Sequence, residues 1–418
     1  MGIIKRYIPT LVYDKIQELE YKNKEHLYVI CDMIYRSSIY KNEDKDYSNI
    51  FMDIPKFYFR DIICDSKNLS MAFDILKRSG VVLSDGIYSK QQGKALGYKF
   101  NNSFISKLIS VNIEKKTITK RIIINKNQRN NLVKEELKTY RDYYLNNFKI
   151  DYDSALNYLN NSYNNSISNL NSSYVGEKRN KEWVKIVHKY NHMMISLSAI
   201  NDGELYFRKN KTNGRIDTNL TSLKSEYKQF IVGGSKLNQI DIVNSQPFIL
   251  SLYLNSLTPS YVGEKVDNRE LRKYTKWTSD GIFYEMMIRE YFTISGKLLE
   301  RDEVKNMMFC VFYSKNGSYR KEKNMFKTIF PSLMEYIERE KNNKHNEFSI
   351  KLQKLESGIC MDIISQRLDK ENIKYFTIHD AWLVSDENLI KTENIILEEF
   401  TNKYNYTPKL KIDKIKNK

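Results

Sequence analysis

Apolar positions in the first part of the chain change from helical spacing to strand spacing. Around 13–37, and again around 70–79, they recur at steps of three and four, which predicts helices. Residues 81–83 and 98–100 form two short apolar runs, which predict the strands of a hairpin. Residues 1–125 are therefore expected to form one small domain of helices followed by a hairpin.

The expected hairpin is rich in glycine and lysine. Turn residues stand at Asp85-Gly86, Gly93 and Gly97, and lysines at 90, 94 and 99. Helices followed by a basic hairpin resemble a winged helix, which commonly binds duplex DNA. The alternative interpretation is a small α+β interaction domain with a solvated basic loop.

Residues 126–204 are polar and rich in Asn and Ser, yet apolar residues still recur at helical spacing. Those that carry the pattern are Ala155, Leu156, Leu159 and Tyr163. The spacing predicts amphipathic helices joined by polar loops. The composition also fits a partly disordered linker, and the sequence leaves both interpretations open.

One acid, Asp241, lies inside a β-type apolar run at 237–243. Pro247 follows this run, and a proline cannot donate a backbone hydrogen bond to a further ladder. The strand is therefore expected to end before Pro247, with the Asp241 carboxylate near its end.

A second acid has the same setting. In KYFTIHDAWLVS, residues 375–378 and 382–384 predict two strands around a tight turn at His379-Asp380. Two carboxylates at neighbouring strand ends can hold two divalent cations about 3.5–4 Å apart. Oxygen ligands of this kind suit Mg²⁺. A single strand-end aspartate is more often a turn former, so the pair needs a third motif to carry the hypothesis.

A helical stripe after residue 300 carries cations and then aromatic residues. Its members follow steps of three and four: Arg301, Lys305, Met308, Phe309, Phe312 and Tyr313. The cations suit the phosphates of a nucleotide, and Tyr313 suits stacking on a base.

These motifs, taken in order, resemble the palm and fingers of family A DNA polymerases and of single-subunit, phage-type RNA polymerases. DIVNSQP resembles the first metal motif and TIHDAWLV the second. The fingers motif Arg-x3-Lys-x7-Tyr, with Phe four residues after the Lys, is met in full by the stripe above. TNGRIDTNLTSL, FKTIFPSLMEYIE and LQKLESGICMDII are weaker matches, and the resemblance covers roughly 205–412.

The resemblance implies a role for each matching residue. Mg²⁺ would be held as two ions, with Mn²⁺ as a substitute, by Asp241 and Asp380. The triphosphate would be bound by Arg301 and Lys305, and Lys305 would also protonate the leaving pyrophosphate. Phe309, Tyr313 and Gln246 would contact the nucleotide, while Arg215 and His379 would contact the primer or template. Asp241, Asp380 and Lys305 would thus be the catalytic set.

Two positions depart from the family's pattern. Gln246 stands where the DNA polymerases carry a Glu that blocks a ribose 2′-hydroxyl and the RNA polymerases a Gly. Ala381 follows the second aspartate, where the families carry Glu or Ser. The choice between deoxynucleotides and ribonucleotides is therefore open, and a third carboxylate is missing from this motif.

The expected fold is α+β: a right-hand polymerase with an antiparallel palm sheet, helical fingers and a reduced thumb, preceded by a winged-helix-like domain. The expected boundaries are 1–125 for that head, 126–204 for the helical linker or reduced thumb, and 205–418 for palm and fingers. A separate proofreading nuclease in addition to a full thumb is not expected within the roughly 200 residues that precede the first of these motifs. Such a compact enzyme would suit DNA synthesis in replication, priming or repair of a phage or mobile element.

Composition agrees with a nucleic-acid partner. Lys and Arg number 68 against 51 acids, which gives a net charge of +17. An AT-rich genome would also enrich Lys, Asn, Ile and Tyr, so part of this charge reflects codon usage. The cysteines show no C-x-x-C spacing, and no apolar run approaches the roughly 20 residues of a membrane span. A cytoplasmic protein without membrane contact is expected.

The expected partners are a DNA template-primer and nucleoside triphosphates, with RNA as a further candidate. A primase or RNA polymerase would keep the fold and change the sugar. A replication initiator with a silent palm, or a terminal transferase that needs no template, are the remaining alternatives. The sequence does not address the oligomeric state.

Overall fold

The computed structural model describes residues 2–39, 50–131, 135–173, 175–232, 237–257, 266–342 and 344–415. Helices and small antiparallel sheets occur together along the chain, which confirms the expected α+β class. The chain forms two compact units. The N-terminal unit comprises Met1–Asn131, Lys149–Tyr206 and Leu223–Val232, and the C-terminal unit comprises Leu132–Phe148, Phe207–Ser222 and Gly233–Lys418. Most of the expected linker or thumb segment thus belongs with the head.

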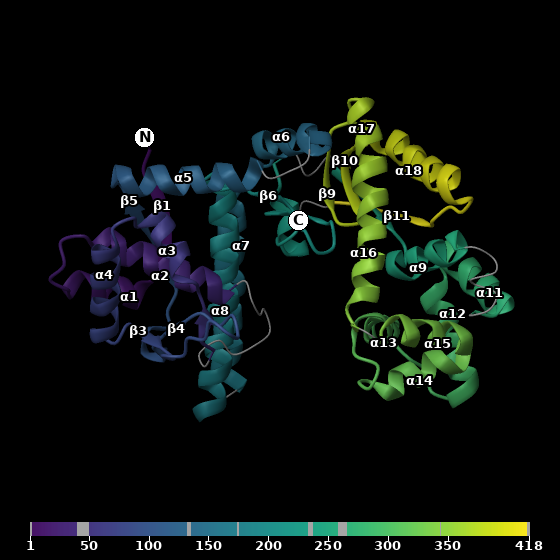
Figure 1. Cartoon of the computed structure of the whole chain (residues 1–418), viewed down its shortest axis with the longest axis horizontal. Helices are drawn as coiled ribbons and strands as arrows, with labels where there is room; N and C mark the ends of the chain where they lie inside the picture. The colour runs from purple at the N-terminus through teal and green to yellow at the C-terminus, as the bar shows by residue number, and fades with distance from the viewer. Residues whose placement is uncertain are drawn as a thin grey trace. The chain divides into compact units, whose positions relative to one another are not determined.

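The N-terminal unit packs helices around two small sheets (Figure 1). Its strands are β1 (Ile4–Pro9), β2 (Met52–Asp53), β3 (Val82–Ser84), β4 (Gly97–Phe100) and β5 (Leu108–Ile113). Its helices are α1 (Thr10–Glu18), α2 (Lys24–Ile39), α3 (Lys56–Ile62), α4 (Ser66–Arg78), α5 (Lys116–Asn131), α7 (Tyr152–Ser173) and α8 (Gly176–Asn201). β1 pairs antiparallel with β5, and the other sheet has the order β2-β4-β3. Fully buried apolar residues such as Ile8, Ile30 and Leu76 form a core between the strands β1 to β5 and the helices α1 to α5.

The hairpin predicted from the sequence is present as β3 and β4, each within one residue of its expected bounds. Gly86 and Gly93 adopt positive φ of 68° and 64° in the connection, as turn glycines should. Gly97 is not a turn residue, and this prediction was wrong. It begins β4, where a Cβ would lie 2.6 Å from an Asp85 carboxylate oxygen, so the close approach of Asp85 requires glycine.

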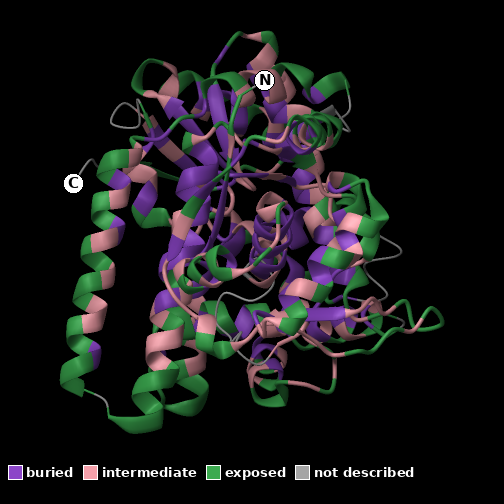
Figure 2. Cartoon of the chain, turned by 90° about the vertical axis from the view of Figure 1, so that its left-hand side faces the viewer, coloured by how far each residue is buried: buried purple, intermediate pink, exposed green. Residues whose placement is uncertain are grey.

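Asn- and Ser-rich residues form long helices, so the helical interpretation of this region is confirmed for its described residues. α7 buries Ala155, Leu159 and Leu170, while most of its other residues are exposed or intermediate (Figure 2). The Tyr190 hydroxyl on α8 donates to Asn160 Oδ1 on α7 at 2.9 Å. A narrow apolar stripe is therefore enough to hold α7 against its neighbour.

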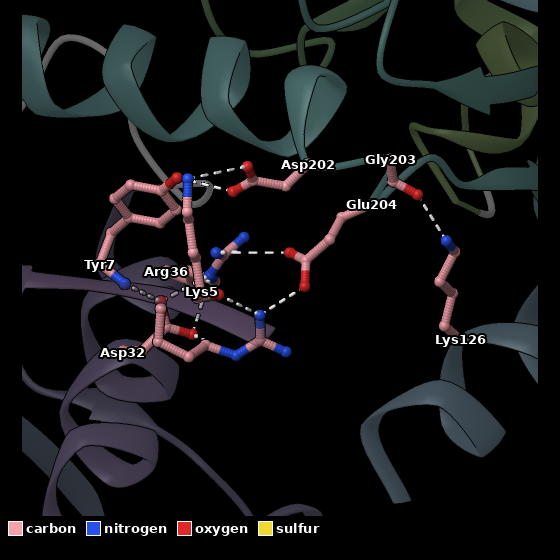
Figure 3. A network of polar contacts seen from close by, with 9 residues as sticks. Lys5, Tyr7, Asp32, Arg36, Lys126, Asp202, Gly203 and Glu204 are labelled. Carbon is pink, nitrogen blue, oxygen red and sulfur yellow. Dashed lines mark hydrogen bonds and ion pairs between the residues drawn. The ribbon is translucent and has the colours of Figure 1, made fainter. Parts of the chain in front are cut away.

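A network of charged side chains joins β1 and α2 to the residues that follow α8 (Figure 3). Arg36 Nε lies 2.9 Å from Asp32 Oδ2, and Arg6 Nε lies 3.4 Å from the same oxygen. Arg6 and Arg36 both pair with Glu204. The Tyr7 hydroxyl donates to Asp202 Oδ2 at 2.6 Å. Acids and cations thus alternate, which satisfies charges that are largely removed from water.

Glu204→Gln is expected to destabilise the N-terminal unit by about 2 kcal/mol at pH 7, because it removes a carboxylate that accepts charged hydrogen bonds. Burial raises the pKa of Glu204, but the charges of Arg6 and Arg36 outweigh burial and lower it. A lowered pKa means that the stabilisation is present above the ordinary value and is lost as pH falls through the lowered one. Urea denaturation at neutral and acidic pH should show that the difference in the free energy of unfolding between wild type and variant becomes smaller in acid.

Glu177→Gln is the control, because Glu177 forms an exposed ion pair with Lys181 on α8, and this variant should change the free energy of unfolding little. A pH-independent difference would contradict the charge network as its cause.

The C-terminal unit is built on one antiparallel sheet with the strand order β11-β8-β10-β9. Its bounds are β8 (Leu237–Ile242), β9 (Tyr375–Ile378), β10 (Ala381–Ser385) and β11 (Leu410–Lys414). β9 and β10 agree with the predicted strands, whereas β11 was not predicted. β8 gives way to α9 (Ser245–Ser256), and Pro247 lies in the first turn of this helix, where a missing N–H costs nothing.

Aromatic side chains fasten α6 (Lys138–Asn147) to β9. The Tyr140 ring stacks on Tyr375 with centroids 4.8 Å apart. The Tyr140 hydroxyl accepts from the Thr377 backbone N–H at 2.8 Å and lies 2.9 Å from the Thr377 hydroxyl. The same helix contacts Phe207, at the start of β6 (Phe207–Lys209), which pairs with β7 (Ile216–Thr218). These contacts cover the edge strand β9.

Helices make up the remainder of the unit (Figure 1). They are α11 (Asn268–Ser279), α12 (Phe283–Ser295), α13 (Arg301–Tyr313), α14 (Arg320–Ile329), α15 (Pro331–Glu340), α16 (Glu347–Ile359), α17 (Gln366–Lys370) and α18 (Leu389–Tyr404). α16 contacts α9 at the sheet and α13 and α15 away from it, and it continues through a π-helical turn at Cys360–Ser365 into α17. Such turns are frequent near functional sites.

Two buried lysines hold the end of α13. Lys341 Nζ donates to the Val311 carbonyl, and Lys323 Nζ donates to the carbonyls of Lys315 and Asn316. Burial lowers the pKa of Lys341 to about 8, so its ammonium form persists at neutral pH. Lys341 thus stabilises a carbonyl in the last turn of α13, and Lys323 holds the loop that follows this helix. In the described parts of the chain, no helix has the length and apolar content needed to cross a bilayer.

Candidate active site

The pairing of β8 with β10 brings the two predicted aspartates together. Ala381 lies opposite Asp241 in the antiparallel register, so Asp380 immediately precedes the residue that faces Asp241. Asp380 follows His379, whose φ of 57° makes the tight turn between β9 and β10. The strand register therefore places both carboxylates at one end of the sheet, as the sequence predicted.

The two aspartates repel each other electrostatically. Burial and the nearby charge of Asp241 raise the pKa of Asp380, while the neighbouring Ser245 side chain acts in the opposite direction. Gln239 Nε2 donates to Asp241 Oδ2 at 2.6 Å. Two half-buried carboxylates at close range carry charge that a cation would neutralise.

A third carboxylate, Glu356 on α16, joins this pair. Its side chain is 1% exposed, and Arg215 binds its Oε1 through Nε at 2.8 Å and through Nη2 at 2.6 Å. Oε2 accepts from the Ser245 hydroxyl at 3.3 Å and from the Gln246 side-chain amide. Burial and Asp380 raise the pKa of Glu356 to about 7. Asp241, Asp380 and Glu356 are called the carboxylate cluster below.

His379 lies beside the carboxylate cluster in a neutral form. Burial and the charge of Arg215 lower its pKa to about 4. Its Nδ1 is shielded from solvent and has no hydrogen-bond partner among the described residues. A neutral imidazole with an unused ring nitrogen can bind a polar ligand group without adding charge.

α13 presents its predicted cations along an exposed ridge. Arg301, Lys305 and Phe309 are exposed and follow each other one turn apart, and the Phe309 ring lies 5.6 Å from that of Tyr313. These four residues are called the α13 ridge. Met308 and Phe312 are buried instead, so the expectation that they share the face of the cations was wrong. Residues four apart, such as Lys305 and Phe309, lie on one side of the helical stripe, whereas a step of three, from Lys305 to Met308, crosses to its other side.

The two ends of the α13 ridge have different surroundings. Tyr313 lies near Glu356, Arg215 and Asp380, and burial raises its pKa to about 12. At the other end, Arg301 Nε bonds to Glu285 Oε1 at 3.0 Å, and its guanidinium lies 5.0 Å from the centre of the Tyr284 ring. Lys305 is exposed between them. The ridge thus leads from exposed cations to the carboxylate cluster.

Six residues predicted as site residues have neighbours within this cluster: Asp241, Asp380, Arg215, His379, Gln246 and Tyr313. Arg301, Lys305 and Phe309 lie further along α13. Sequence reasoning missed Glu356 and the hydroxyl of Ser245. The available signal for Glu356 was its place in the stripe Phe348, Leu352, Glu356, Ile359, because an acid at a buried helical position needs a reason.

The donor set fits a hydrated divalent cation. Among the described residues, no group of three or more His, Cys, Asp or Glu side chains is arranged to hold a metal ion. Mg²⁺ usually takes only one or two protein carboxylates and completes its shell with water and substrate phosphates. Asp241 and Asp380, adjacent and mutually repelling, are suited to that role.

Comparison with known proteins adds no identification. No family model matches the chain, and no match is found among proteins of curated function.

Proposed function

We propose that the protein is a template-directed nucleic-acid polymerase that extends a primer with nucleoside triphosphates. The observation that carries the proposal is the strand register that sets Asp380 beside Asp241, at the end of the sheet to which the α13 ridge leads. Phosphoryl transfer needs positioning and charge neutralisation more than covalent catalysis, and this arrangement supplies both.

In the proposed reaction, the primer 3′-hydroxyl oxygen forms a bond to the α-phosphorus. The bond from that phosphorus to the bridging oxygen breaks, pyrophosphate leaves, and the hydroxyl proton passes to water. Asp241 and Asp380 would hold Mg²⁺, which when bound supplies positive charge to the attacking and leaving oxygens. Lys305 and Arg301 would bind the triphosphate, and Lys305 would donate a proton to the pyrophosphate.

The same geometry suggests roles for the remaining residues. Phe309 and Tyr313 offer ring faces on which a base can stack. His379 offers an unused ring nitrogen for the primer end. The ion pair with Glu356 fixes the Arg215 guanidinium beside the carboxylate cluster. In this proposal the guanidinium contacts the primer or template there.

The head supports a nucleic-acid partner. The order α2, β2, α3, α4, β3, β4, with the sheet order β2-β4-β3, agrees with the winged-helix resemblance. α5 carries Lys116, Lys120 and Arg121 exposed, and its sequence KTITKRIIINKNQRNN contains no acid. A solvent-facing helix of this kind suits the phosphate backbone of a duplex.

Lys116→Gln combined with Lys120→Gln is expected to weaken duplex binding, because each lysine that contacts a phosphate releases about one counterion. The slope of log Kd against log salt concentration should fall by about 2 in fluorescence anisotropy titrations. Lys181→Gln with Lys185→Gln is the matched control, because these lysines of α8 are paired with Glu177 and Glu182. An unchanged slope in the α5 variant would remove α5 from the binding surface.

The function itself is tested by extension of a labelled primer on a DNA template with Mg²⁺, with a lane that lacks primer and a lane that lacks template. Products that follow the template sequence support the proposal. Untemplated addition would indicate a terminal transferase, and products without primer would indicate a primase. Duplex binding without incorporation in any lane would refute the enzyme and leave a DNA-binding initiator.

A further inference from the structure

Four large apolar side chains of the N-terminal unit lie exposed in two short segments. Ile87 and Tyr88, in the connection between β3 and β4, are 54% and 67% exposed. Phe57 and Tyr58, in the first turn of α3, are 48% and 43% exposed, and their rings lie 4.1 Å apart. Side chains of this kind are usually buried, so a group of them in solvent indicates a binding surface.

The strand register brings the two segments to one end of the β2-β4-β3 sheet. Asp53, the last residue of β2, lies opposite Gly97 in β4. The next residue, Ile54, donates its backbone N–H to the Leu96 carbonyl at 3.2 Å, so the chain leaves β2 towards the β3–β4 connection. α3 begins two residues later, at Lys56. The four exposed side chains therefore belong to the same end of the sheet and are called the aromatic end below.

Hydrogen bonds hold the β3–β4 connection in place. Asp85 Oδ1 accepts from the backbone N–H groups of Ile87 at 3.0 Å and Gly97 at 2.9 Å. Asp85 Oδ2 lies 3.2 Å from Lys94 Nζ. Ser89 and Lys94 exchange two backbone hydrogen bonds, of 3.0 and 2.8 Å. The apolar pair in this connection is therefore held in solvent by an ordered, hydrogen-bonded loop.

Cations accompany the aromatic end. Lys56 directly precedes the aromatic pair of α3, and Lys90 follows the apolar pair of the connection, and both lysines are exposed. Asp53 is an exposed acid at the end of β2. Residues 85–99 contain three lysines and one acid, which gives the connection a net charge of +2. The surroundings of the exposed rings thus favour an anionic partner.

We propose that the aromatic end binds an unpaired nucleic-acid strand, with its rings stacked on bases and with Lys56 and Lys90 against the phosphates. Rings flanked by cations suit a single strand, because each unpaired base offers a face for stacking and each link a phosphate. A duplex keeps its base faces stacked inside. The surface uses residues other than those of α5 proposed above for a duplex, and it does not depend on polymerase activity.

Fluorescence anisotropy with the full-length chain, without Mg²⁺ or nucleotide, tests the proposal. It compares a labelled oligothymidine of about 12 nucleotides with an abasic strand of the same length, which keeps the phosphates and lacks the bases. Wild type is expected to bind oligothymidine at least tenfold more tightly. Equal affinity for the two strands would overturn the proposal. Because no incorporation is measured, failure of the polymerase proposal would leave this result unaffected.

Variants separate stacking from apolar contact. Tyr58→Leu combined with Tyr88→Leu removes two rings and keeps apolar side chains, so affinity for oligothymidine should fall about tenfold while affinity for the abasic strand stays within about twofold. Tyr58→Phe with Tyr88→Phe keeps both rings and is the matched control, expected within about twofold of wild type. Unchanged oligothymidine affinity in the leucine variant, as an apolar protein-docking surface would give, or equal losses on both strands, would contradict stacking.

Photo-crosslinking shows where the strand lies. A single strand that carries 5-iododeoxyuridine is irradiated with the wild-type chain, and the crosslinked peptides are identified by mass spectrometry. Crosslinks are expected in the peptides that contain Tyr58 and Tyr88. Crosslinks confined to residues 233–418 would place the strand on the C-terminal unit and overturn the proposal.

Discussion

Asp380→Asn is expected to lower templated incorporation by about a thousandfold, the largest effect of any single substitution in this chain. The variant removes one of two adjacent carboxylates proposed to hold Mg²⁺, whose stabilisation of charge in the transition state amounts to several kcal/mol. A loss of about 4 kcal/mol corresponds to that factor. Single-turnover primer extension under saturating nucleotide measures it.

The same variant should fold at least as well as wild type without metal. Burial and Asp241 raise the pKa of Asp380, which means that the folded state disfavours its charge. A neutral amide removes that repulsion, so the melting temperature should not fall. Asp280→Asn is the matched control, because Asp280 is a solvent-facing acid paired with Lys276. Near-normal incorporation by Asp380→Asn would exclude Asp380 as a metal ligand.

Lys305→Met is expected to reduce kcat/KM for the nucleotide by about a hundredfold. Lys305 is exposed on the α13 ridge, one turn from Arg301 and one from Phe309, so its removal should leave the fold intact. A preorganised cation aimed at developing phosphate charge contributes about this factor in enzymes. Pre-steady-state kinetics, with nucleotide concentration varied, should show a loss in the rate of incorporation as well as in affinity.

The control for this variant is Lys297→Met. Lys297 precedes α13 and pairs with Glu303 at 3.8 Å, so it shares the charge and the neighbourhood of Lys305 without belonging to the ridge. It should lower kcat/KM by no more than about twofold, as a screened surface charge does. Equal losses in both variants would assign the effect to net charge near α13 rather than to Lys305.

Local sequence pattern was sufficient for elements whose geometry depends on neighbours in the chain. β9, β10 and the turn at His379-Asp380 were predicted because two short apolar runs flank a two-residue polar break. α13 was predicted from its repeat, since side chains four residues apart share a face of any helix. The partition of that repeat into the exposed Lys305 and the buried Met308 was not predictable, because it depends on which neighbours cover the helix.

Local sequence pattern did not predict which distant segments of the chain pair with each other. β11 lies beside β8 in the sheet although about 170 residues separate them in sequence, and its pattern LKIDK is short and charged. Glu356 was missed for the same reason, because a single acid in a helix gives no indication of its partners. Its partners, Arg215 and Gln246, are more than 100 residues away.

The sequence by itself determined the α+β class, the hairpin of the head and the two strand-end aspartates, whereas for the polar segment it left helices and a disordered linker both open. These follow from side-chain periodicity and turn residues, which act over a few positions. Only the tertiary structure gave the strand register that sets Asp380 beside Asp241, and only it showed that Glu356 joins them and hydrogen-bonds to Gln246. Those relations arise from strand register and from the packing of α16 on α9, where burial strengthens charges and hydrogen bonds between residues far apart in the chain.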